Sequence, residues 1–141
     1  MTLYDDLGGF DAILAICVRW HELCLADPLA AHPFERPIHH RHDERLAAYL
    51  AEATGGPALY TGGYGDQYKV SRIHAGNGPA DELVGRCCDL FDVALADQGV
   101  VGETAERFST YFREATDRLE AYPFSSRDVP RDVPFDYALD R

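Results

Sequence analysis

Histidine side chains are the groups in this sequence best suited to chemistry, because imidazole binds metal ions and exchanges protons near neutral pH. The chain has six histidines, and three of them lie in the segment His39-His40-Arg41-His42. Positions i, i+1 and i+3 of a helix do not converge on one point, so this segment alone does not predict a closed zinc site. We expect the first two to lie in solvent, and His42 to point inward on the same face as Leu46.

A further histidine, His74, ends a short amphipathic segment immediately before the loop Gly76-Asn77-Gly78. Taken alone, a histidine in that place is more often a surface or capping residue than a metal ligand. Its local sequence therefore leaves its role open.

Composition excludes several classes of partner. Lys and Arg number 13 against 24 Asp and Glu, which gives a formal net charge of −11. A chain this acidic is not expected to bind nucleic acid or anionic membranes, since both require a basic face. The longest apolar run, residues 12–18, is too short to span a bilayer, and the N-terminus is acidic. We therefore expect a cytoplasmic protein.

The chemistry-bearing residues are carried by segments with helical periodicity. Apolar residues recur every three or four positions, and Gly and Pro clusters separate one segment from the next. The pattern predicts helices over residues 10–24, 38–53, 67–74, 79–94 and 104–119, with an irregular stretch between the second and third. No convincing strand is found, so we predict an all-α fold. Residues 1–124 form the expected domain and residues 125–141 a C-terminal tail.

Several short motifs occur together in one order along the chain. They are Tyr4-Asp5-Asp6-Leu7-Gly8-Gly9, Leu25-Ala26-Asp27-Pro28-Leu29, Phe34, Arg45-Leu46-Ala47-Ala48-Tyr49-Leu50 and Gly55-Gly56-Pro57-Ala58-Leu59-Tyr60, followed by His74. This set resembles the truncated haemoglobins, most closely those of group II, over roughly residues 4–122. The resemblance implies a two-on-two helical sandwich that encloses haem b.

The resemblance also assigns roles around the haem. His74 matches the proximal histidine that binds the iron, and Phe34 matches the aromatic residue that packs on the haem face. Leu46 and Tyr49 are counted among the residues that line the cofactor. The propionates of haem are anionic, so Lys69 and Arg72, which flank His74, are candidate partners for them; ordinary solvated charge is the alternative.

On the distal side the sequence departs from the family. His21 stands where the family usually has a tyrosine that donates a hydrogen bond to the ligand. A neutral histidine can donate one too. His42 falls at the first distal position of the next helix, so the pocket is predicted to hold two distal histidines. Exposure beside Glu22 is the alternative for His21, and direct binding of His42 to iron is a further hypothesis.

A second departure is Cys87, which occupies the position of a large tryptophan in group II relatives. We expect Cys87 to face the haem on the buried stripe of its helix, with Cys88 pointing elsewhere. The smaller side chain would enlarge the distal cavity. The four cysteines, Cys17, Cys24, Cys87 and Cys88, contain no C-x-x-C pair and are expected to be free thiols.

Three functions remain open from the sequence. The first is a haem globin that binds O₂, NO or CO and has redox activity towards NO or peroxide, with a reductase as electron donor. The second is a haem enzyme that acts on a small organic substrate in the enlarged pocket. The third is a helical module that has lost haem and acts as a sensor or binding protein; His74 and Phe34 argue against it.

Overall fold

In a computed structural model, which describes residues 1–139 and 141, the regular structure is entirely helical. The helices are α1 (Leu3–Leu7), α2 (Phe10–Leu25), η1 (His32–Phe34), α3 (His42–Ala53), α4 (Gln67–His74), α5 (Asp81–Asp97), α6 (Gly102–Leu119) and η2 (Ser126–Asp128). No strand occurs among the described residues, which confirms the all-α prediction.

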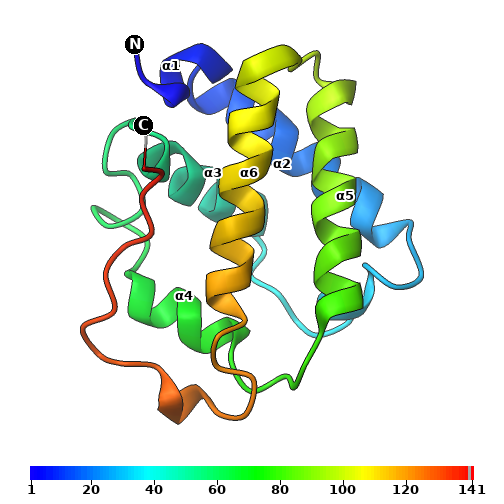
Figure 1. Ribbon diagram of the computed structural model, residues 1–141, viewed down its shortest axis with the longest axis vertical. Helices are drawn as coiled ribbons and strands as arrows, with labels where there is room; N and C mark the ends of the chain where they lie inside the picture. The colour runs from blue at the N-terminus through cyan, green and yellow to red at the C-terminus, as the bar shows by residue number, and fades with distance from the viewer. Residues whose placement is uncertain (140) are drawn as a thin grey trace.

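The long helices form two layers. In Figure 1, α5 and α6 run side by side, and α2 and α3 lie behind them. Helix α2 packs on both α3 and α5, and α5 packs on α6. Aromatic rings fill the space between the layers: Phe91 stacks on Phe112 at 3.8 Å, and Trp20 meets Phe112 edge-on at 5.7 Å. The predicted two-on-two sandwich is confirmed.

The start of α3 differs from the prediction, and α5 buries one cysteine that the prediction left out. Helix α3 begins at His42 rather than near residue 38, because the backbone N–H of His42 bonds to the carbonyl of His39 in a turn that precedes the helix. In α5 the fully buried residues include Cys88 and Phe91, whereas Cys87 is only half-buried. Phe91 and Ala94 are buried as predicted, and Cys88 is buried in addition because its thiol contacts Thr116 on α6. Whether Cys87 faces the haem stays a prediction.

Helix α4 and the loop after it are tied firmly to the rest of the molecule. The Asp66 side chain caps α4 by accepting a hydrogen bond from the backbone N–H of Lys69. After the helix, the backbone N–H groups of Gly76 and Gly78 donate to the carbonyls of Tyr122 and Pro123. Both glycines have a positive φ, 77° and 72°, which other residues rarely adopt. The sequence therefore fixes the path of the chain on both sides of α4.

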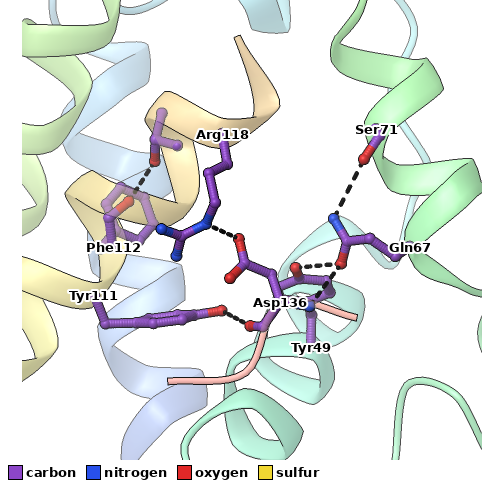
Figure 2. Close-up of polar contacts among 8 residues, drawn as sticks. Tyr49, Gln67, Ser71, Tyr111, Phe112, Arg118 and Asp136 are labelled. Carbon is purple, nitrogen blue, oxygen red and sulfur yellow. Dashed lines mark hydrogen bonds and ion pairs between the residues drawn. The ribbon is translucent and has the colours of Figure 1, made fainter. Parts of the chain in front are cut away.

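The C-terminal segment lies along the molecule rather than apart from it. Figure 2 shows Asp136 at the centre of a polar network that joins this segment to α3, α4 and α6. Its side chain accepts from Arg118 at 2.7 Å, its carbonyl from the Tyr111 hydroxyl at 2.6 Å, and its N–H donates to Gln67 at 3.3 Å. The same Gln67 oxygen accepts from the Tyr49 hydroxyl at 2.6 Å. Residues 125–139 thus help to hold α4 in place.

Phe135 provides the apolar part of this attachment. Its ring lies 4.7 Å from that of Tyr49 and 6.5 Å from that of Tyr60. Three residues further on, the N–H of Ala138 donates to the carbonyl of Ala53 at 2.9 Å. The division of the chain into residues 1–124 and a tail stays a prediction, but this segment is packed on the helices.

Replacing Phe135 with alanine tests the attachment. We expect the free energy of unfolding to fall by about 2 kcal/mol, less than for a fully buried Phe because the ring is half-buried. Phe124, 83% exposed, offers a matched control, and Phe124→Ala should change stability by less than about 0.5 kcal/mol. Equal effects of both substitutions in urea unfolding would show that the segment is not held as described.

Candidate functional site

Two histidines from different helices share one carboxylate. His21 lies on α2, and His42 and Asp43 begin α3. Oxygen Oδ1 of Asp43 is 2.8 Å from Nδ1 of His21 and 3.2 Å from Nδ1 of His42. We call these three residues the histidine–aspartate cluster. The packing of α2 on α3 brings them together across a sequence gap of more than twenty residues.

Phe34 holds the two imidazole rings in place. Its ring centroid is 4.6 Å from that of His21 and 5.6 Å from that of His42, while the two imidazoles are 5.3 Å apart. The three rings therefore form one group, with Phe34 supplied by the short helix η1. The side chains in the histidine–aspartate cluster are between 17% and 30% exposed, so solvent reaches the group.

The shared carboxylate determines where each ring carries its proton. An ionised carboxylate can only accept hydrogen bonds, so both Nδ1 atoms must donate. A neutral imidazole has only one N–H group, so the Nε2 atom of each ring is left as an acceptor with a free lone pair. The hydrogen bond to a ligand that the sequence analysis expected from His21 would require the other tautomer.

His74, at the end of α4, has one ring nitrogen engaged and the other free for a metal ion. Its Nδ1 donates to the backbone carbonyl of Val70 at 2.8 Å. A histidine that binds a metal usually donates its second ring N–H to a carbonyl or a carboxylate in this way, which fixes the tautomer and the ring orientation. The lone pair of Nε2 is then directed away from the helix backbone.

The electrostatics of His42 and His74 favour the neutral, metal-binding form. Burial lowers the pKa of His42, although the Asp43 carboxylate opposes this shift. The side chain of His74 is accessible to solvent, yet enough protein surrounds the ring for desolvation to lower its pKa as well; its hydrogen bond to Val70 opposes that effect. A positive charge on His42 would lower the pKa of His74 further.

A model of the family described as bacterial-like globin matches residues 2–120 of the sequence. The chain belongs to the bacterial-like globin family. Globins hold haem, so this chain is a haem-binding globin. A search of curated proteins finds no match to it.

Solved structures agree with this assignment. The fold of this globin is similar to a crystal structure of the group II truncated haemoglobin from Bacillus anthracis, with a TM-score of 0.74, 19% sequence identity, and coverage of 87% of this chain and 93% of that one. A variant of the same protein matches with a TM-score of 0.75 and 18% identity, over 92% and 97% of the two chains. The resemblance to truncated haemoglobins stated from the sequence is confirmed at the level of the fold.

The side chains of this globin fit a haem. A haem requires one imidazole for its iron and walls that are otherwise largely apolar. His74 provides an imidazole with a free Nε2, and its orientation is set by Val70. Phe34 and Leu46 are half-buried and pack against the hydrophobic core. The chain thus offers the imidazole ligand and apolar surface that a haem requires.

Lys69 and Arg72 do not lie on the side of α4 that carries His74. At 100° per residue, the two bases project about 140° and 160° away from the direction of His74. Both are exposed, and they line a surface hollow with Tyr68 and Ser126 on the outer face of the helix. The guanidinium of Arg72 lies 5.3 Å from the centre of the Tyr68 ring. The expectation that these bases pair with propionates stays a prediction.

Tyr49 serves the C-terminal network instead of the group around His42. Its hydroxyl donates to Gln67, its ring packs on Phe135, and burial raises its pKa. Leu46, one helical turn after His42, stays available as an apolar wall. These positions do not test the expectation that both residues line the haem, which stays a prediction.

Cys87 lies beside a second cysteine. The thiol of Cys24 donates a hydrogen bond to that of Cys87; together with burial this raises the pKa of Cys24, and it lowers the pKa of Cys87. The indole N–H of Trp20 donates to the carbonyl of Cys87 at 2.9 Å. All four cysteines are free thiols, as expected. An enlarged cavity at Cys87 stays a prediction.

Sequence analysis did not identify Asp43. An acidic residue in the first turn of a helix is ordinary, since it stabilises the helix dipole. Nothing in the sequence indicates that His21, on another helix, shares its carboxylate. None of the described helices of this globin is long and apolar enough to span a bilayer.

Proposed function

We propose that this globin binds haem b through His74 and takes O₂ or another diatomic gas as its ligand, with the histidine–aspartate cluster on the opposite side. The observation that carries the proposal is the hydrogen bond from His74 Nδ1 to Val70. It leaves a neutral Nε2 free at the position that the family resemblance assigns to the iron ligand. Haem, when bound, supplies the iron that binds the gas and that changes oxidation state.

Several residues of the chain position the groups that would surround the haem. Val70 keeps the His74 ring in the tautomer that can bind a metal, and the Gln67–Asp136 contact holds α4 against the C-terminal segment. Phe34 on η1 and Leu46 on α3 supply apolar surface for the cofactor. Asp43 keeps the Nδ1 protons of His21 and His42, so these rings present hydrogen-bond acceptors to anything that binds beside them.

An absorption spectrum of the purified protein tests the central claim. We expect an intense Soret band, and a shift of this band when carbon monoxide is added to the reduced protein. A protein that takes up no haem when haem is supplied would contradict the proposal. That result would favour a binding module without a cofactor.

Rates of O₂ dissociation test the state of the distal rings. Because Asp43 holds the Nδ1 protons, we expect His21→Leu and His42→Leu each to change the dissociation rate by less than about threefold. A hydrogen bond donated to the ligand is worth about 1.5–3 kcal/mol, which would make dissociation roughly tenfold faster or more when it is lost.

Asp43→Ala is the variant in which we expect the O₂ dissociation rate to change clearly. Without the carboxylate, either ring can carry its proton on Nε2 and donate it to the ligand, so we expect O₂ dissociation to slow by up to about tenfold. Faster dissociation in Asp43→Ala, or a tenfold increase in either leucine variant, would show that a distal ring donates in the unmodified protein.

A further inference from the structure

We propose that His21, His42 and Asp43 form a binding site for a divalent first-row transition-metal ion, separate from the iron site at His74. Each residue offers one ligand atom, and these atoms all lie within 4.8 Å of one another. The proposal does not depend on haem, because none of these three residues is the proposed iron ligand.

Two of the three distances between the ligand atoms are close to those in a metal site, and the two imidazole nitrogens are at most 4.8 Å apart. Asp43 Oδ1 is 2.8 Å from one imidazole nitrogen and 3.2 Å from the other. Two ligands bound about 2.1 Å from a metal, at angles between octahedral and tetrahedral, are separated by about 3.0–3.4 Å. Small side-chain adjustments would therefore allow one ion to replace the two hydrogen bonds.

The ligand types indicate which ions would bind. Imidazole suits zinc, copper, iron and nickel, and two histidines with one carboxylate on one side of an ion leave its other positions open. The cluster is partly exposed, with the Asp43 side chain 27% accessible, so water can complete the coordination. The carboxylate and the net charge of −11 both favour a cation at this place.

The fold holds the three ligands before any ion arrives. His42 and Asp43 are adjacent in the first turn of α3, and the packing of α2 on α3 sets the position of His21. Phe34 contacts both imidazole rings and restricts their rotation. Preorganised ligands lose less conformational entropy on binding, which favours affinity.

A metal ion bound at this site would change the protonation of the Nε2 atoms of His21 and His42. A metal ion takes the lone pair of Nδ1, so the single proton of each neutral ring moves to Nε2, and no net proton is released. His21 and His42 would then be hydrogen-bond donors on the edge away from Asp43. This consequence rests on the proposed function, and it predicts slower O₂ dissociation when the metal is bound.

Isothermal titration of the full-length protein, as purified, with Zn²⁺ tests the site. His39 and His40 are exposed with stacked rings and could bind zinc adventitiously, so the titration is also made with both replaced by alanine. We expect one Zn²⁺ per chain in each protein, with affinities within threefold of each other. Absence of binding, or its loss in the His39/His40 variant, would overturn the proposal.

Substitutions in the cluster should then abolish the site. We expect His21→Ala, His42→Ala and Asp43→Asn each to weaken Zn²⁺ binding at least tenfold, since even residues that only support a metal ligand commonly contribute this much. Asp43→Asn keeps the size of the side chain, and circular dichroism checks that each variant is folded. Unchanged affinity in any folded variant would exclude that residue as a ligand.

A matched control is available on η1. His32 and Glu35 form an exposed histidine–carboxylate pair at 3.1 Å, and His32→Ala should leave Zn²⁺ affinity unchanged within threefold. Equal weakening by His32→Ala would count against the proposed cluster.

The outcomes for haem and for zinc separate the two proposals. Zinc binding in a protein that cannot take up haem would contradict the proposed function alone, whereas haem uptake without zinc binding would contradict this inference alone.

Discussion

Replacing His74 with alanine is expected to reduce haem affinity by more than about 100-fold. Residues that only orient a metal ligand typically contribute 10–100-fold to metal affinity, and removal of the ligand itself should have a larger effect. The substitution leaves the rest of α4 intact, because its fixed residues are Gln67 and Ser71, which are buried. Haem transfer to an acceptor protein, followed by absorbance, measures the change.

The control for this experiment is His32→Ala, since His32 is exposed and pairs only with the neighbouring Glu35 among the contacts described. This variant should retain haem as the unmodified protein does. In His74→Gly, added imidazole is expected to restore much of the haem spectrum by occupying the space of the missing ring. Full haem retention with an unchanged spectrum in His74→Ala would rule out the proximal assignment.

Glu52→Ala is expected to lower the free energy of unfolding by about 3 kcal/mol. The Glu52 side chain is 3% exposed, and its two oxygens accept four hydrogen bonds. Oε1 accepts from the backbone N–H groups of Tyr60 and Thr61, and Oε2 from the hydroxyls of Thr61 and Tyr137. Alanine would leave the buried N–H of Tyr60 unsatisfied, at about 1–3 kcal/mol, and would remove three part-buried hydrogen bonds from Thr61 and Tyr137.

Two further variants separate the hydrogen bonds from general effects on α3 or on charge. Glu52→Gln keeps the oxygen that accepts from Tyr60 and Thr61, so we expect it to lose less stability than Glu52→Ala. Glu106 is exposed on α6, and Glu106→Ala should change stability by less than about 0.5 kcal/mol. Chemical unfolding compares all three. A loss below about 1 kcal/mol for Glu52→Ala would show that the loop 55–66 does not depend on this carboxylate.

Local sequence patterns determined most of the helices. The segment 10–24 has apolar residues at a single helical spacing, and α2 covers it. Helix α4 matches the expected range 67–74, because a capping aspartate precedes it and glycines follow. The start of α3 was less predictable. Residues 38–41 continue the polar and apolar pattern, but a turn between His39 and His42 holds them outside the helix.

Which face of a helix is buried depends on its neighbours, and the sequence pattern resolved this only in part for α5, where it placed Phe91 and Ala94 correctly and missed Cys88. Cys87 and Cys88 have the same side chain, so composition does not distinguish them. The packing of α6 buries Cys88 and leaves Cys87 beside Cys24. For Lys69 and Arg72, helix geometry shows only that they leave α4 in other directions than His74, and their role beside a haem stays a prediction.

The sequence by itself determined the helical fold, the family resemblance, and the histidines worth testing, because residue type and spacing are local properties. Only the tertiary structure brought His21 to the carboxylate of Asp43, and Asp136 to Gln67, Tyr111 and Arg118. These contacts join residues far apart in the chain. Their geometry follows from how whole helices pack. The contact of His21 and His42 with Asp43 then decides which ring nitrogen carries the proton.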